Sequence, residues 1–151
     1  MRQLLIENKK YKDMISLLIN KFKLDFEENE ELKNLKKQYK EIIKNDVNKG
    51  DIKSAQIKID EYQSLFEFES EILNLKAITK ILSSEFIEAD NILKQACMID
   101  RNNYDVIFNI ACIKEMLGEF NESIKYLDYI IKYCGEETIV SDAKGKIAEI
   151  I

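Results

Sequence analysis

The residues that could carry out chemistry in this 151-residue chain are three cysteines and many carboxylates, since histidine is absent. Histidine is the commonest general acid or base and the commonest protein metal ligand. Cys97, Cys112 and Cys134 are odd in number and form no CxxC pair, which predicts reduced thiols rather than a disulfide framework. No phosphate loop, nucleophile elbow or metal signature is present. We therefore predict no catalytic residue, cofactor or metal here, and leave open a flanking catalytic domain.

Two of the cysteines and the acidic runs have simple structural interpretations. Cys97 lies beside Leu93 and Ala96 in an apolar segment, where a free cysteine packs as a small hydrophobe. Cys134 falls at a predicted helix end, where a reactive role is not favoured. The carboxylates of 28–31 and 136–137 lie in predicted connections, and solvation explains them better than a cation site.

A row of lysines offers a second kind of chemistry, the binding of negative charge. Lys33, Lys37, Lys40 and Lys44 are three or four residues apart, which places them on one face of a helix. Such a row binds an acidic partner or is simply a solvated face, and the sequence leaves both interpretations open.

Composition sets the class of protein that must position these residues. Apolar residues make up 46% of the chain and charged residues 34%, a balance typical of one globular domain. Proline is absent and glycine occurs four times, which favours long helices over tight turns. No apolar run has the length of a membrane span or a signal peptide, so we expect a cytoplasmic protein without a membrane partner.

Charge argues against a nucleic-acid partner. The formal net charge is −5, and only two of the basic residues are arginines. Residues 1–50 have a net charge of +3, whereas residues 51–151 have a net charge of −8. An acidic chain of this kind lacks the broad basic surface that phosphate binding requires.

An internal repeat of 34 residues organises the chain. Gly50, Ser84 and Gly118 follow one another at this interval without a gap, as do the small residues Ala55, Ala89 and Ser123. Apolar residues within each unit recur every three or four positions, which predicts two helices per unit. We therefore predict an all-α fold of stacked antiparallel helix pairs.

The turn between paired helices has its own sequence signals. Gly50 and Gly118 are suited to the left-handed conformation that ends a helix. Asp51 and Asn121 lie where a side-chain oxygen could cap the next helix. The small residues one turn later would allow the paired backbones to approach closely.

The period and several residues resemble the tetratricopeptide repeat (TPR) family. The closest match combines Asn109-Ile110-Ala111, Gly118-Glu119-Phe120 and Glu122-Ser123-Ile124. The resemblance covers residues 36–137, but the usual proline near each repeat end is replaced by Glu67 and Arg101, and Lys76 stands where leucine is preferred. It implies a right-handed superhelical solenoid whose first helices line a concave groove.

We divide the chain accordingly as a single TPR-like domain, 1–151. A partial pair occupies 1–24, an extended loop or lengthened helix start follows near Asp25–Glu31, and three repeats span 36–69, 70–103 and 104–137. A last helix, 138–151, is unpaired, which suggests a fragment of a longer protein.

The resemblance places a peptide-binding groove on the first helices. We expect it to be basic at one end, apolar in the middle and mixed at the other, formed by Lys37, Lys40, Lys44, Asn74, Ile78, Leu82, Asp105, Phe108, Cys112, Glu115 and Met116. A peptide with an acidic end and apolar anchors would suit such a groove. Ile78, Ile81 and Leu82 could instead pack against the neighbouring pair.

Two special chemistries of the groove are weighed and not favoured. A reactive Cys112 would need a neighbour that lowers its pKa, and none is adjacent in sequence. A clamp for a partner's C-terminal carboxylate would use Asn109, but Leu75 and Asp105 stand where polar and basic groups are needed.

Our leading functional prediction is a non-catalytic scaffold that binds a protein or peptide. One alternative is the repeat segment of a larger enzyme, because Lys/Ile/Asn-rich repeats of this kind resemble those of bacterial glycosyltransferases. A second is a peptide-sensing regulator. Self-association through exposed apolar surface on the terminal helices is also open.

Overall fold

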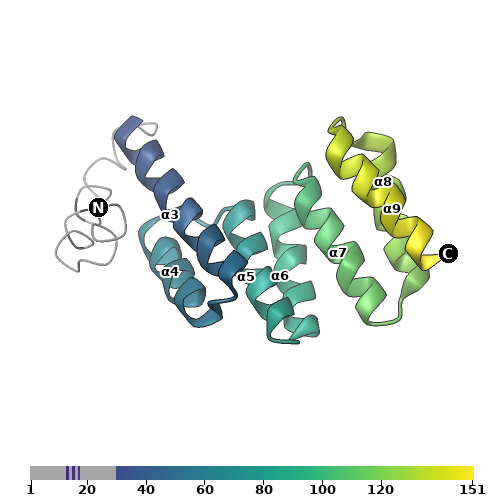
Figure 1. Ribbon diagram of the computed structural model, residues 1–151. Coiled ribbons are helices and arrows are strands. Elements are labelled where there is room, and N and C mark those ends of the chain that lie inside the picture. Colours follow the sequence, from purple (N-terminus) through teal and green to yellow (C-terminus); the bar gives the residue numbers. More distant parts are fainter. Residues whose placement is uncertain (1–12, 14, 16, 18–29) are drawn as a thin grey trace. The chain divides into compact units, whose positions relative to one another are not determined.

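Helices account for all regular structure in the part of the chain that the computed structural model describes, residues 13, 15, 17 and 30–151 (Figure 1). Seven helices lie within 30–151: α3 (Glu30–Lys49), α4 (Ile52–Leu65), α5 (Ser70–Leu82), α6 (Phe86–Ile99), α7 (Tyr104–Met116), α8 (Phe120–Tyr133) and α9 (Glu137–Ile150). The all-α fold of helix pairs is thus confirmed. The predicted partial pair at 1–24 lies outside the described residues, apart from the three isolated positions.

The chain divides into two compact units, Met1–Glu67 and Phe68–Ile151, which are treated separately below. The first unit contains the α3–α4 pair, and the second contains the α5–α6 and α7–α8 pairs followed by α9. The single domain that the sequence suggested stays a prediction. For the end of the segment Asp25–Glu31 we had predicted either an extended loop or a lengthened helix start. Helix α3 already includes Glu30 and Glu31, so these two residues form a lengthened helix start.

The turn between paired helices repeats at the predicted positions. Gly50 and Gly118 both have φ of 77°, and the equivalent Ser84 adopts the same left-handed region with φ of 61°. In each turn the next residue donates its backbone N–H to a carbonyl five residues back, at 2.7–2.9 Å. These bonds satisfy carbonyls that the helix end would leave unpaired. The left-handed helix ends at the two glycines are confirmed.

Replacing Ser84 by glycine should stabilise the second unit by about 0.5–1 kcal/mol, because a side chain with a Cβ is strained at positive φ. Ser84 is exposed, so the change removes no packing. Urea denaturation followed by circular dichroism would measure the gain. The matched control is Ser83→Gly, at φ of −90°, which should lower stability. Equal effects of the two changes would contradict this explanation.

Small residues bring the paired helices together, as predicted. Ala55, Ala89 and Ser123 are fully buried at equivalent positions of α4, α6 and α8. The hydroxyl of Ser123 donates to the backbone carbonyl of Ala111 at 2.7 Å, so this polar group is satisfied inside the pair.

Of the two predicted helix caps, one is confirmed and one is wrong. Asp51 Oδ1 accepts from the backbone N–H of Ser54 at 3.2 Å. Asn121 instead lies within the first turn of α8, because the preceding turn ends at Glu119 and the helix begins at once with Phe120. A cap that the sequence analysis missed is Asn103, whose Oδ1 accepts from the N–H of Val106 at 3.4 Å at the start of α7.

The first unit packs α3 on α4 around Tyr39, Ile43, Ile59 and Tyr62, all essentially inaccessible to solvent. The rings of Tyr39 and Tyr62 meet edge to face with centroids 5.8 Å apart.

A buried ion pair lies beside the core of this unit. The ammonium of Lys58 contacts Asp46 Oδ2 at 2.8 Å, and the hydroxyl of Ser54 donates to the same oxygen at 2.8 Å. Only 6% of the Lys58 side chain and 12% of the Asp46 side chain are exposed. At the equivalent place, α6 has the apolar Ile92 and α8 has Tyr126, so Lys58 is a polar exception in the repeat.

The second unit has two apolar clusters. One joins α5, α6 and α7 through residues such as Leu73, Leu93 and Ile110, and the other joins α7, α8 and α9 through Ala111 and Leu127, among others. The half-buried Cys97 packs against both clusters, which confirms its predicted role in packing.

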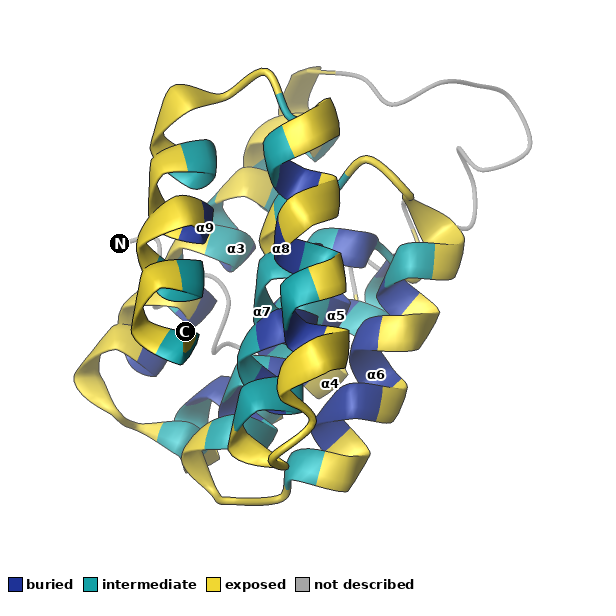
Figure 2. Ribbon diagram, turned by 90° about the vertical axis from the view of Figure 1, so that its right-hand side faces the viewer, coloured by how far each residue is buried: buried dark blue, intermediate teal, exposed yellow. Residues whose placement is uncertain are grey.

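The last helix presents a mostly polar outward side. Of its residues, Ala143 is buried in the second cluster, whereas those exposed are Glu137, Thr138, Ser141, Asp142, Lys144, Gly145, Ala148 and Glu149 (Figure 2). None of these is a large apolar residue. The apolar residues along α9 are turned onto the second cluster, whereas Ile151, the last residue of the helix that we predicted at 138–151, is 90% exposed. Self-association through this end of the chain stays a prediction.

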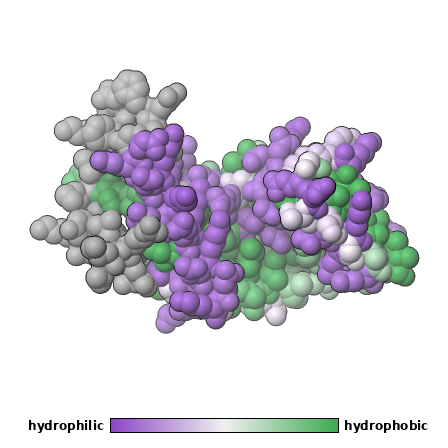
Figure 3. Space-filling view, turned by 45° about the horizontal axis from the view of Figure 1, so that its top comes forward, coloured by the Kyte–Doolittle hydropathy of each residue, from purple (hydrophilic) through white to green (hydrophobic). Residues whose placement is uncertain are grey.

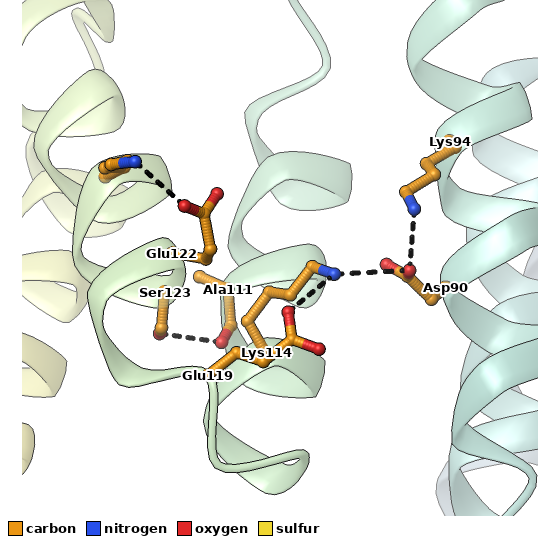
Figure 4. A network of polar contacts seen from close by, with 8 residues as sticks. Asp90, Lys94, Ala111, Lys114, Glu119, Glu122 and Ser123 are labelled. Carbon is orange, nitrogen blue, oxygen red and sulfur yellow. Dashed lines mark hydrogen bonds and ion pairs between the residues drawn. The ribbon is translucent and has the colours of Figure 1, made fainter.

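A lysine recurs at the same repeat position of α5 and α7 and ties each pair together. Lys80 contacts Glu85 at 3.2 Å, and Lys114, 34 residues later, contacts Glu119 at 3.0 Å. Lys114 also lies 3.5 Å from Asp90 of α6, so it links successive pairs (Figure 4). Its hydrogen bond to Glu119 raises the pKa of Lys114, with Asp90 adding to the effect.

Candidate functional site

The incompletely buried side of α5, α7 and α9 forms the candidate site, which we call the open face. Its residues are Asn74, Ile78, Leu82, Asp105, Phe108, Cys112, Glu115, Met116, Asp142, Lys146 and Glu149, and all except Asp105 have an equivalent in this set 34 residues away. The eight predicted groove residues of α5 and α7 are all half-buried or exposed. The three on α9 were missed, although adding 34 to Phe108, Cys112 and Glu115 gives their positions.

Amide hydrogen bonds fix α5 against α7 at this face. Asn109 Nδ2 donates to Asn74 Oδ1 at 2.8 Å, and Asn103 Nδ2 donates to the hydroxyl of Ser70 at 3.1 Å. Both bonds join residues about one repeat apart, so they hold neighbouring first helices at a set spacing. Asn74 thus has a structural role in addition to its place on the open face.

An ion pair joins α7 and α9 at the open face. Lys146 of α9 contacts Glu115 of α7 at 2.7 Å, and Glu149 lies 3.5 Å from the same ammonium. About a quarter of each of the Lys146 and Glu115 side chains is exposed. The hydrogen bond from Lys146 to Glu115 raises the pKa of the lysine. Glu115 therefore positions α9 and is already paired before any partner binds.

Cys112 lies half-buried between these charges. Burial is the main cause that raises the pKa of its thiol, while nearby Lys146 opposes the rise and Glu115 and Glu149 add to it. A raised pKa keeps the thiol protonated and poorly nucleophilic near neutral pH. The structure thus offers Cys112 for contact with a partner rather than for covalent chemistry.

The apolar part of the open face is concentrated at the C-terminal ends of α5 and α7. Leu82 is 49% exposed and Met116, its equivalent one repeat later, is 55% exposed. Phe108 and Ile81 are half-buried and pack against the two core clusters. We had considered that these residues could pack against the neighbouring helix pair instead of lining a groove. Ile81 does pack against a core cluster, whereas about half of Leu82 is exposed.

The predicted lysines occupy one face of α3 in the other unit. Lys33, Lys37 and Lys44 are exposed and Lys40 is half-buried, and hydrophilic side chains gather over this helix (Figure 3). Lys36 lies off this row, with its ammonium 5.2 Å from the ring centre of Phe66. A groove that runs continuously from Lys37 to Met116 would include both units and stays a prediction.

The part of the chain that the structure describes contains no cluster of metal ligands and no membrane-spanning helix. No group of three or more cysteine or carboxylate side chains gathers there as a metal site would require. None of the helices that the structure describes is both long and apolar enough to cross a bilayer.

Comparison with known families agrees with a helical scaffold. The model of the coatomer epsilon subunit family matches residues 19–150, nearly the whole chain. The chain belongs to this family. The TPR resemblance is confirmed at the coarser level of a TPR-like helical fold, and the coatomer epsilon subunit family is the assignment with a direct match. No curated protein matches the sequence.

Proposed function

We propose that this chain is a non-catalytic protein-binding scaffold whose open face receives a segment of another protein chain. The observation that carries the proposal is the stripe of half-buried and exposed side chains that recurs on α5, α7 and α9. The word subunit in the name of the coatomer epsilon family also suits a chain that acts within an assembly. The family match supports neither of the two alternatives, the repeat segment of a glycosyltransferase or a peptide-sensing regulator.

The open face has the composition expected of a binding surface. Leu82 and Met116 are exposed apolar side chains, and removing them from water on binding would contribute favourably to the binding free energy. Asp105 and Asp142 are exposed carboxylates that would orient a partner with positive charge. The lysine row of α3 would favour acidic groups on the same or another partner.

Affinity capture followed by mass spectrometry tests this proposal. The double variant Leu82→Asp, Met116→Asp should lose at least about tenfold of the captured partner, because two buried anchors would become charged. The matched control is Ile87→Asp, Met98→Asp on α6, whose side chains are 73% and 85% exposed. Partner yield should be unchanged in the control. Equal yields from both variants would overturn the assignment of the open face.

A further inference from the structure

The incompletely buried side of α7 carries an apolar stripe. Phe108, Cys112 and Met116 are four residues apart, which places them on one face of the helix over about 12 Å. Phe108 and Cys112 are half-buried, and Met116 is 55% exposed. Removing the rest of this apolar surface from water is favourable, so the stripe suits a partner that presents an apolar stripe of its own.

Helix α9 packs on α7 and presents charged side chains beside this stripe. Asp142 and Lys146 are the equivalents, one repeat later, of Phe108 and Cys112. The ammonium of Lys146 lies 2.7 Å from Glu115 of α7 and opposes the rise in the pKa of the Cys112 thiol, so this part of α9 borders the stripe. The two helices therefore form one surface with an apolar side on α7 and a charged side on α9.

The charged side on α9 has an excess of carboxylates. Lys146 is already paired with Glu115, and Glu149 shares the same ammonium at 3.5 Å while 69% of its own side chain is exposed. Asp142 is exposed and makes no ion pair with any residue that the structure describes. Asp142 and Glu149 are seven residues apart on one face of α9, or about 10 Å. Charge complementarity therefore calls for an occupant with two positive charges at about this spacing.

We propose that the occupant of this surface is an amphipathic helix of another protein with a basic edge. Its apolar residues, which recur every three or four positions, pack along the stripe of Phe108, Cys112 and Met116. Two of its lysines or arginines, seven residues apart, lie about 10 Å from one another and meet Asp142 and Glu149. This inference rests on the proposed function, because it names the chemistry of the segment that the open face receives.

Three peptides built on one alanine-rich helical sequence test the chemistry of the occupant by calorimetric titration of the whole chain. All three have leucines four residues apart. The first has two arginines, seven residues apart, beside the leucine stripe, the second has them on the opposite side of the helix, and the third has glutamates in their place. The first should bind about fivefold more tightly than the second and at least about tenfold more tightly than the third, because exposed ion pairs contribute modestly and like charges repel.

Charge reversal on α9 tests the position of the contact. The variant Asp142→Lys, Glu149→Lys should bind the first peptide at least about tenfold more weakly and the glutamate peptide more tightly than the unmodified chain does. The matched control is Asp128→Lys, Glu137→Lys, which makes the same change in net charge at exposed carboxylates outside the open face. The control should bind the first peptide like the unmodified chain. Circular dichroism of each variant establishes that it is folded.

Two results would overturn the inference: no binding of the first peptide, or equal loss of binding in the Asp142 and Glu149 variant and in its control. Equal affinities for the three peptides would do the same, because the basic edge would then have no role. If the inference fails while the Leu82 and Met116 variant still loses a captured partner, the proposed function stands without it.

Discussion

Replacing Lys58 by methionine is expected to destabilise the α3–α4 unit by about 3–5 kcal/mol. The carboxylate of Asp46 would remain almost fully buried with only the Ser54 hydroxyl as a partner. A buried charge without its counter-ion costs much more than an exposed ion pair contributes. Hydrogen exchange of the α3 and α4 amides measures the loss within this unit, because amide protection reports local opening.

A double variant distinguishes the effect of the unpaired charge from the effect of changing side-chain volume in the core. Asp46→Leu combined with Lys58→Met removes both charges and keeps an apolar side chain at each position. Such replacements are often neutral or stabilising, so the pair should differ from the unmodified chain by no more than about 1 kcal/mol. If the single Lys58 variant were as stable as the double variant, the unpaired carboxylate would not be the cause of instability.

Replacing Ile110 by alanine should destabilise the second unit by about 2–5 kcal/mol. Ile110 is 2% exposed and lies in the cluster that joins α5, α6 and α7, so its removal leaves a cavity shared by three helices. Urea denaturation followed by circular dichroism, together with exchange of the α5–α7 amides, measures the loss.

Ile78→Ala is the matched control because Ile78 is half-buried on the open face and belongs to neither core cluster. A partly exposed side chain contributes less to stability, so the loss should stay below about 1.5 kcal/mol. Comparable losses at the two positions would mean that Ile78 is part of the core and not of a binding surface.

A sequence prediction succeeded where the feature depends on one residue and its near neighbours, and failed where it depends on the exact hydrogen bonds of a turn. The left-handed turns at Gly50 and Gly118 were predictable, since a helix end needs a particular backbone conformation that glycine adopts readily. Asn121 was wrongly predicted as a helix cap, because α8 begins at Phe120, only two residues after Gly118, and Asn121 already lies inside the helix. A shift of one or two residues at a helix end depends on hydrogen bonds that a sequence pattern does not contain.

The candidate site shows the same division. The TPR resemblance indicated which residues of α5 and α7 would line a groove, and all eight of them are half-buried or exposed. It did not reveal that Glu115 is already paired with Lys146, or that Asn109 holds Asn74. Those partners lie 31 and 35 residues away in sequence, and only the packing of neighbouring first helices brings them together.

The TPR resemblance indicated which face of α5 and α7 is left incompletely buried. The repeat interval in the sequence by itself determined the helix pairs and their turns. It could do so because burial on a helix follows a period of 3.6 residues and each pair repeats the same geometry. The tertiary structure alone decided which charges on that face are already satisfied and that Lys58 turns inward to Asp46. Charge pairing depends on distances of a few ångströms between separate helices, and no periodicity within one helix specifies them.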